Sequence, residues 1–153
     1  MFYQNQYQLA YATSEISKAV QIMEQQFGVP QFKGLTGESY IENRVWTPEG
    51  EADIAMRVAI ATVGHLTIEL LEPVSGAIGI FTDFLTPNQP MRLHHIAMRC
   101  DDVDVVRAEH EKLGRRVVMA GSYKAARFIY IDTRDTLGHY LEYASAPAEF
   151  WNR

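Results

Sequence analysis

The sequence predicts an α+β fold in which the element order β-α-β-β-β occurs twice. Three observations predict this fold: each half of the chain opens with an apolar strand pattern followed by a helical pattern, each helix ends at a glycine, and three β-rich runs follow. Because each half is too short to bury a good core alone, we expect the 153 residues to form one domain. Its expected parts are a module over about 5–73, a connector over 74–92, a second module over about 93–146 and a tail over 147–153.

The first half begins with residues 7–12, which alternate as a strand does and place Gln8 on one face. Ser14 is the expected N-cap of a helix over 16–27, and Gly28 ends that helix. The apolar stripe of the helix consists of Ile16, Ala19, Val20, Met23 and Phe27. Three further strands are expected, over 39–46, 53–63 and 65–71.

The second half repeats this order after a proline-containing connector. A strand is expected over 93–100 and a helix over 103–113, with Asp101 or Asp102 as the cap of the helix. The residues expected on the buried side of that helix are Val105, Val106, Ala108 and Leu113. The remaining strands are expected over 116–120, 126–132 and 139–144. The aromatic tail that follows should pack back on the body of the domain.

The composition narrows the classes of function. The chain is 47% hydrophobic and 22% charged, as is usual for a globular protein, and its net charge of −5 argues against a nucleic-acid partner. No apolar run is long enough for a transmembrane helix, and the first residues lack the pattern of a signal peptide, so we expect no membrane partner. Cys100 is the only cysteine, which excludes an intrachain disulfide and makes a cytoplasmic location the default expectation.

Four polar residues occupy matching places in the two halves. When the two strand–helix pairs are aligned, Gln8 corresponds to His95, and the last strand of each half carries a glutamate inside an apolar run, Glu69 or Glu142. A carboxylate with apolar neighbours is costly unless it is paired, solvated or bound to a metal. Amide, imidazole and carboxylate groups together favour a divalent ion such as Zn, Ni, Co or Mn.

Several of these residues also have simpler interpretations. Gln8 taken alone is as well explained as a solvated strand residue, and His94, which points to the other strand face, is best explained as structural. The histidines expected to be solvated are His65, His110 and His139. Three cations are candidates for binding an anionic substrate, although exposed charges are common: Lys124, Arg127 and Arg99.

The chain resembles the vicinal oxygen chelate superfamily, which includes glyoxalase I, methylmalonyl-CoA epimerase, extradiol dioxygenases and bleomycin-resistance proteins. The segments that carry the resemblance are 64–73, 93–98, 101–104 and 138–143. The resemblance implies two βαβββ modules whose mixed sheet curls around a cleft, the glyoxalase/bleomycin resistance/dihydroxybiphenyl dioxygenase fold. It also implies a homodimer and a metal held by Gln8, Glu69, His95 and Glu142.

The four implied ligands favour proton transfer over oxygen chemistry, because a set with one histidine departs from the two-His-one-carboxylate pattern of iron dioxygenases. The leading hypothesis is a metal-dependent isomerase, epimerase or lyase that resembles lactoylglutathione lyase or methylmalonyl-CoA epimerase. Its substrate would be a small molecule such as an anionic thioester or a glutathione adduct. Glu142 is the expected catalytic base, with Glu69 second. The alternatives are a metal-free binding protein of the bleomycin-resistance type and, third, an extradiol dioxygenase.

Overall fold

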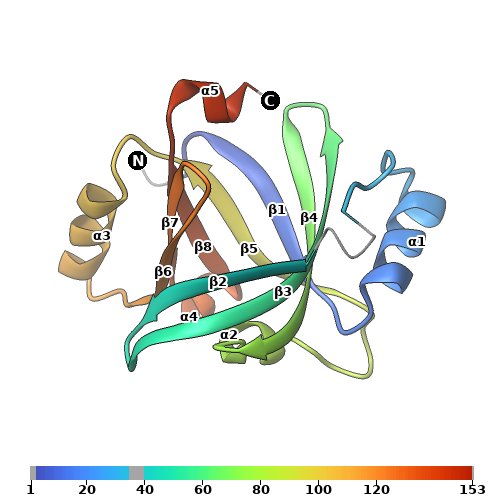
Figure 1. The fold of residues 1–153 in the computed structure, drawn as a ribbon, viewed down its shortest axis with the longest axis horizontal. Coiled ribbons are helices and arrows are strands. Elements are labelled where there is room, and N and C mark those ends of the chain that lie inside the picture. Colours follow the sequence, from blue (N-terminus) through green and yellow to red (C-terminus); the bar gives the residue numbers. More distant parts are fainter. Residues whose placement is uncertain (1–2, 35–39, 153) are drawn as a thin grey trace. The chain divides into compact units, whose positions relative to one another are not determined.

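The computed structural model describes residues 3–34 and 40–152, so Ser39, at the start of the strand expected over 39–46, lies outside the described residues. The strands are β1 (Gln6–Ala12), β2 (Tyr40–Thr47), β3 (Gly50–Val63), β4 (Leu66–Gly76), β5 (Arg92–Arg99), β6 (Val117–Tyr123), β7 (Ala126–Ile131) and β8 (Tyr140–Ser145) (Figure 1). The helices are α1 (Ile16–Phe27), α2 (Gly79–Thr82), α3 (Val103–Lys112), α4 (Arg134–Leu137) and α5 (Ala148–Trp151). The α+β class and the repeated order β-α-β-β-β are confirmed, with α4 inserted before the last strand.

The chain divides into two compact units, which are described separately. The first-half unit consists of Gln8–Asn43 and Asp53–His94, and the second-half unit of Met1–Tyr7, Arg44–Ala52 and His95–Arg153. The turn between β2 and β3 thus belongs to the second-half unit, although it lies in the first half of the sequence.

In the first-half unit, β4 pairs in parallel with β1 and antiparallel with β3. Helix α1 packs on β4, as Figure 1 shows, because its apolar stripe faces the sheet. The core of this unit consists of Ile16, Ala19, Val20, Met23, Phe32, Ala59, Ala61 and Leu70. Four of the five predicted stripe residues are therefore buried, while Phe27, at the end of the helix, is 71% exposed.

The start of α1 differs from the prediction. Ser14 is not the N-cap: the cap residue is Glu15, and its side chain makes no capping hydrogen bond. The acceptor comes from β4 instead, because Oε2 of Glu72 accepts a 2.9 Å hydrogen bond from the Ile16 backbone N–H. The other oxygen of Glu72 accepts a 2.9 Å hydrogen bond from Arg57. A residue 56 positions away in sequence therefore supplies the cap, which no local pattern could reveal.

Replacement of Glu72 with alanine should lower the free energy of unfolding by about 1–2 kcal/mol, because the first turn of α1 loses its acceptor. Urea unfolding would measure the change. Glu51→Ala is the matched control, since the Glu51–Arg44 ion pair at 3.3 Å is exposed on both sides and should change stability by less than about 0.5 kcal/mol. Equal losses in the two variants would contradict the capping role of Glu72.

In the second-half unit, β7 lies between β6 and β8 in antiparallel pairs, and β8 pairs in parallel with β5. Strand β2 joins β6 where Trp46 lies opposite Ala120. Helix α3 packs on β7 and β8. The core of this unit consists of Met98, Val103, Val117, Ile129, Ile131, Leu141 and Tyr143.

The buried face of α3 also differs from the prediction. Asp102 caps the helix as expected, accepting a 2.8 Å hydrogen bond from the Asp104 backbone N–H. The buried residues of α3, however, are Val103 and His110, and the predicted Val105 is 56% exposed. Of the other predicted residues, Leu113 and Ala108 are exposed and Val106 is half-buried. The prediction failed because a histidine takes a core position on this helix.

His110 is fully buried, contrary to the expectation that it is solvated, because both ring nitrogens have partners. Arg115 donates a 3.2 Å hydrogen bond to Nδ1 of His110, so the proton of the neutral ring is on Nε2, which lies 3.2 Å from the Tyr143 hydroxyl oxygen. Burial, with a smaller contribution from Arg115, lowers the pKa of His110 from 6.5 to about 4.

The contribution of His110 to the stability of the protein should therefore fall between pH 6.5 and pH 4, where the unfolded chain protonates His110 and the folded chain does not. The contribution of this histidine to that fall is about 3 kcal/mol at most. Urea unfolding at pH 7 and at pH 4.5 should show a smaller difference in His110→Gln than in the original protein. His65→Gln, at an exposed position, should keep the original difference, and a His110→Gln variant that also kept it would contradict the assignment.

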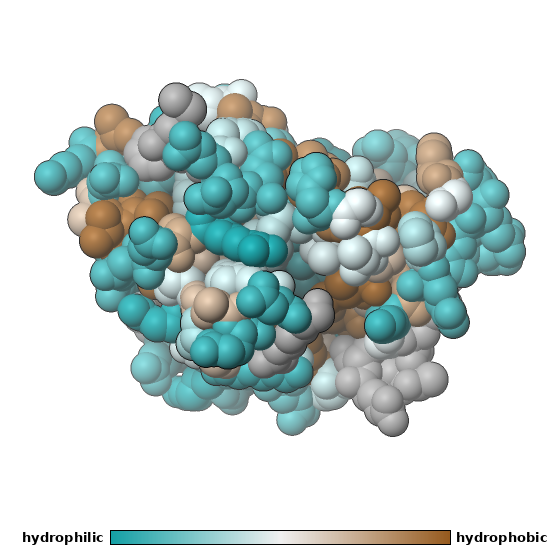
Figure 2. Space-filling model, turned by 90° about the horizontal axis from the view of Figure 1, so that it is seen from above, coloured by the Kyte–Doolittle hydropathy of each residue, from teal (hydrophilic) through white to brown (hydrophobic). Residues whose placement is uncertain are grey.

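The aromatic tail packs on the second-half unit, as predicted. The ring of Trp151 lies 5.0 Å from the ring of Tyr7, and its Nε1 donates a 3.2 Å hydrogen bond to the Ala146 carbonyl oxygen. Polar residues cover most of the face seen in Figure 2, and apolar areas are scattered among them. Among the helices of the described residues, none combines the length and the apolar character that crossing a membrane requires.

Candidate functional site

The structure brings His95 of β5 into contact with Glu142 of β8. In the parallel pairing of these strands His95 lies opposite Tyr140 and Ala97 lies opposite Glu142, so His95 and Glu142 are diagonal neighbours on one face of the sheet. Nε2 of His95 lies 2.8 Å from Oε2 of Glu142. Both side chains are buried, with exposed fractions of 0% and 8%. Two of the four predicted site residues therefore form a buried pair.

Burial determines the protonation of this pair. Desolvation, with a smaller contribution from His139, lowers the pKa of His95 from 6.5 to about 3. Desolvation also raises the pKa of Glu142 from 4.5 to about 8, against a smaller opposing effect of its hydrogen bond with Tyr130. At neutral pH the proton therefore resides on Glu142, and the imidazole of His95 is neutral.

Tyr130 belongs to the same cluster and was missed by the sequence analysis. It lies directly opposite Glu142 in the antiparallel pairing of β7 and β8, and its hydroxyl forms a hydrogen bond with the Glu142 side chain. Its ring centroid lies 4.9 Å from that of His95, edge to face. The alternation of residues along β7 predicts which residues share a strand face with Tyr130. Only the pairing of β7 with β8 shows that Tyr130 and Glu142 lie on the same face of the sheet.

The first-half unit repeats this arrangement of strands. Gln8 lies opposite Thr67 and Ala10 lies opposite Glu69 in the parallel pairing of β1 and β4, so Gln8 and Glu69 have the same diagonal relation as the pair in the other unit. Gln8 is buried and donates a 3.3 Å hydrogen bond from Nε2 to the Thr67 hydroxyl, whereas Glu69 is half-buried. This shared register supports the alignment of Gln8 with His95.

The pair of His95 and Glu142 fits two ligands of a divalent ion. Neutral imidazole nitrogen and carboxylate oxygen both bind Zn, Ni, Co and Mn. His95 is already neutral, whereas Glu142 would release its proton when an ion binds. Two ligand atoms at about 2.0–2.2 Å from one ion lie about 2.8–3.1 Å apart at 90° and about 3.3–3.6 Å apart at the tetrahedral angle, so the observed 2.8 Å matches the 90° arrangement. Within residues 3–34 and 40–152, no group of three or more His, Cys, Asp and Glu side chains is close enough to hold a metal ion.

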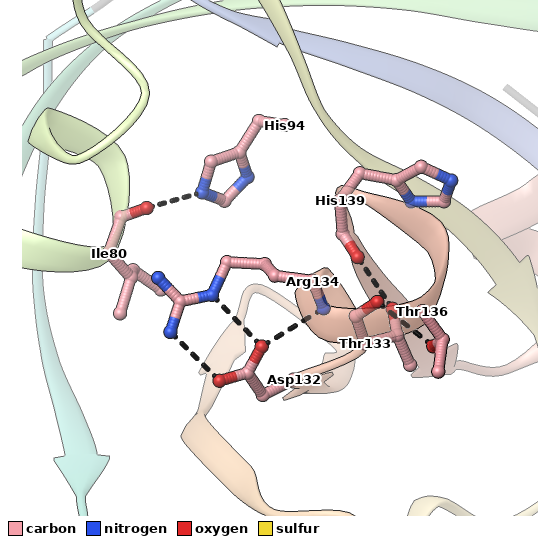
Figure 3. Close-up of polar contacts among 7 residues, drawn as sticks. All are labelled: Ile80, His94, Asp132, Thr133, Arg134, Thr136 and His139. Carbon is pink, nitrogen blue, oxygen red and sulfur yellow. Dashed lines mark hydrogen bonds and ion pairs between the residues drawn. The ribbon is translucent and has the colours of Figure 1, made fainter.

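His94, the neighbour of His95 in sequence, has a structural role, as predicted. Its Nε2 donates a 2.9 Å hydrogen bond to the Ile80 carbonyl oxygen (Figure 3). Its ring is stacked on Phe81, with centroids 4.4 Å apart, and also contacts Phe84. The fully buried His94 therefore holds the short helix α2 against β5 within the first-half unit.

A network of polar contacts fixes the segment that leads into β8. Arg134 donates hydrogen bonds of 2.9 Å to both carboxylate oxygens of Asp132, and the Thr133 hydroxyl donates to the His139 carbonyl oxygen at 2.5 Å (Figure 3). His139 is half-buried rather than solvated, while His65 is exposed as expected.

The three candidate anion-binding cations have different surroundings. Arg127 forms a two-pronged pair with Asp104 of α3, with N–O distances of 3.0 and 3.1 Å. Lys124 lies 5.4 Å from the ring centroid of the adjacent Tyr123. Arg99 lies over aromatic rings near the C-terminal helix. Arg127 thus already has a carboxylate partner, in agreement with the simpler interpretation.

Comparison with known proteins places these features in a family. The sequence profile of the Glyoxalase/Bleomycin resistance protein/Dioxygenase superfamily matches residues 7–131. A search of curated protein sequences found no match.

Solved structures share the fold at low sequence identity. Methylmalonyl-CoA epimerase from Mycobacterium tuberculosis has a TM-score of 0.64 at 16% identity, covering 99% of this chain and 94% of that one. A hypothetical protein from Bacillus halodurans has a TM-score of 0.63 at 16% identity, covering 94% of each chain. A variant of Streptomyces coelicolor methylmalonyl-CoA epimerase in complex with 2-nitronate-propionyl-CoA has a TM-score of 0.58 at 20% identity, covering 94% and 95%.

The structural likeness establishes the fold, and the sequence profile, which spans most of the chain, establishes the family. The chain belongs to the glyoxalase/bleomycin resistance protein/dioxygenase superfamily.

Proposed function

We propose that this protein is a divalent-metal-dependent isomerase, epimerase or lyase that moves a proton on the carbon next to a carbonyl group. The observation that carries the proposal is the buried contact of 2.8 Å between His95 and Glu142, with Tyr130 hydrogen-bonded to the same carboxyl group. A pure binding protein would have no need to bury an ionisable pair in this way, since burial of such groups is costly.

We propose His95 and Glu142, together with Gln8 and Glu69, as the residues that hold the metal. The support is the repeated register, which gives each half a nitrogen- or oxygen-bearing side chain diagonal to a glutamate. The hydrogen bond from Nε2 of Gln8 to Thr67 leaves the amide oxygen as the Gln8 atom that would bind a cation. When bound, the ion would supply Lewis-acid chemistry by polarising the carbonyl oxygen of the substrate.

Glu142 is the proposed acid and base. Its carboxyl group lies 2.8 Å from Nε2 of His95 and is hydrogen-bonded with Tyr130, so it is positioned to accept and return a proton. Tyr130 would hold this carboxyl group in place through its hydroxyl. Because the ring of His95 is neutral, the proton that is transferred would be the one on Glu142. Glu69 is the second candidate for the same role in the other half.

The substrate class we favour is an acyl-CoA thioester. Two of the structural neighbours are methylmalonyl-CoA epimerases in complex with 2-nitronate-propionyl-CoA and with methylmalonyl-CoA. A glutathione hemithioacetal is the second choice, because the glyoxalase name of the family points to it. The homodimer and the cytoplasmic location expected from the sequence stay predictions.

The test begins with metal analysis of protein purified without chelator. The protein would then be assayed with methylmalonyl-CoA and with methylglyoxal–glutathione hemithioacetal, each in the presence of Zn, Ni, Co or Mn. Deuterium uptake from D2O at the carbon next to the carbonyl would report proton transfer independently of product formation. We expect near-stoichiometric metal and exchange with one of the two substrates. Only traces of metal, with no exchange under any metal, would refute the proposal.

A further inference from the structure

The second-half unit contains a cavity at the end of β5, away from the candidate site. Its volume is about 590 Å3, and its walls come from the segment before β1, from α3, from β8 and from α5. None of His95, Glu142 and Tyr130 lines it. Tyr143 of β8 does line it. Because adjacent residues of a strand point to opposite faces, Tyr143 and Glu142 lie on opposite faces of β8. The cavity is therefore separate from the site formed by His95 and Glu142.

One wall of the cavity presents a cation on an aromatic surface. The Arg99 guanidinium lies 4.6 Å from the ring centroid of Trp151 and 5.7 Å from that of Tyr7. The hydrogen bond from Trp151 to Ala146 fixes the larger ring. Across the described ranges 3–34 and 40–152, no carboxylate forms an ion pair with Arg99. A guanidinium stacked on its face keeps its N–H edge for a carboxylate ligand.

The opposite charge is present in the same cavity. Asp101 and Glu109 line it, and neither carboxylate forms an ion pair with another residue of the part that the structure describes. Burial raises the pKa of Cys100, another residue of the cavity wall, to about 11, and the nearby charge of Asp101 is the next contribution. These two carboxylates thus favour a positive group in the cavity.

Part of the cavity wall is held in position before any ligand arrives. Tyr143 is 3% exposed, and its hydroxyl contacts His110, which is itself fixed by Arg115. Val106 and the ring of Trp151 add apolar surface. A preorganised wall lowers the entropy cost of binding a small ligand.

We propose that this cavity binds a small zwitterion of the α-amino acid class, with its carboxylate on Arg99 and its ammonium group on Asp101 and Glu109. The cavity volume lies within the range of about 300–1,000 Å3 that is usual for small-molecule sites. Two carboxylates beside one guanidinium disfavour phosphates and other polyanions. An amino acid with an aliphatic side chain also matches the apolar surface. The site goes beyond the proposed function and does not depend on it.

The test compares three probes that share the leucine side chain: L-leucine, L-leucinamide, which lacks the carboxylate, and N-acetyl-L-leucine, which lacks the ammonium group. Titration would follow the fluorescence of Trp151 in a Trp46→Phe background, with calorimetry as a second measurement. We expect saturable binding of L-leucine and binding of each analogue weaker by about tenfold or more. No saturation with L-leucine below about 10 mM, or equal affinity for either analogue, would overturn the proposal.

Variants locate the site. Arg99→Gln and Glu109→Gln should each weaken L-leucine binding by about tenfold or more. Glu109 is exposed on α3, so its replacement does not threaten folding even if Arg99→Gln loosens the tail. Arg107→Gln is the matched control, because Arg107 lies on the same helix, 4.5 Å from the Trp46 ring, and does not line the cavity. Unchanged L-leucine affinity in Glu109→Gln would also overturn the proposal.

Discussion

Glu142→Gln should lower turnover by about 100-fold or more, because removal of a positioned acid and base typically costs that much. Glutamine has nearly the shape of the protonated carboxylic acid, and burial keeps Glu142 protonated below a pKa of about 8. The variant should therefore fold normally and lose activity through chemistry rather than packing. The measurement is kcat with whichever substrate is turned over, together with deuterium exchange next to the carbonyl.

Glu111→Gln provides the control for this variant, since Glu111 is an exposed partner of Arg107 on the surface of α3. It should leave kcat unchanged. The same experiment separates an enzyme from a metal-free binding protein of the same superfamily, which would keep its ligand affinity when Glu142 is replaced. A kcat for Glu142→Gln equal to that of Glu111→Gln would show that Glu142 does not move the proton.

Addition of a divalent metal should raise the thermal midpoint of chelator-treated protein by about 5–10 °C. An ion at 100 times its dissociation constant stabilises the folded state by about 2.7 kcal/mol, and each kcal/mol shifts the midpoint of a domain of this size by about 2–4 °C. His95→Ala should abolish this shift, because it removes the neutral imidazole that faces Glu142. Differential scanning calorimetry with Zn, Ni, Co and Mn would measure it.

The quantity to compare is the shift caused by the metal, since removal of the buried ring of His95 is expected to lower the midpoint of the metal-free protein as well. His65→Ala, at an exposed position, is the control and should keep the full shift. Equal shifts in His95→Ala and in the original protein would place the bound metal elsewhere in the chain and contradict the proposed ligand set.

Local patterns predicted most of the elements, and the errors arose where remote residues decide the structure. The apolar stripe of α1 and the Asp102 cap of α3 depend only on residues close together in sequence, so both were predictable. Ser14 was assigned a capping role that Glu72 of β4 takes instead. His110 looked solvated because its partners, Tyr143 and Arg115, come together with it only in the folded chain.

The sequence by itself determined the fold class, the repeated element order and the alignment of Gln8 with His95, because these depend on periodicity and spacing along the chain. The tertiary structure alone decided that His95 meets Glu142 at 2.8 Å and that Tyr130 joins them. It also decided where the proton of the pair resides. The pKa of each group depends on how much water the paired strands exclude, and desolvation is a property of the packed sheet that no stretch of sequence carries.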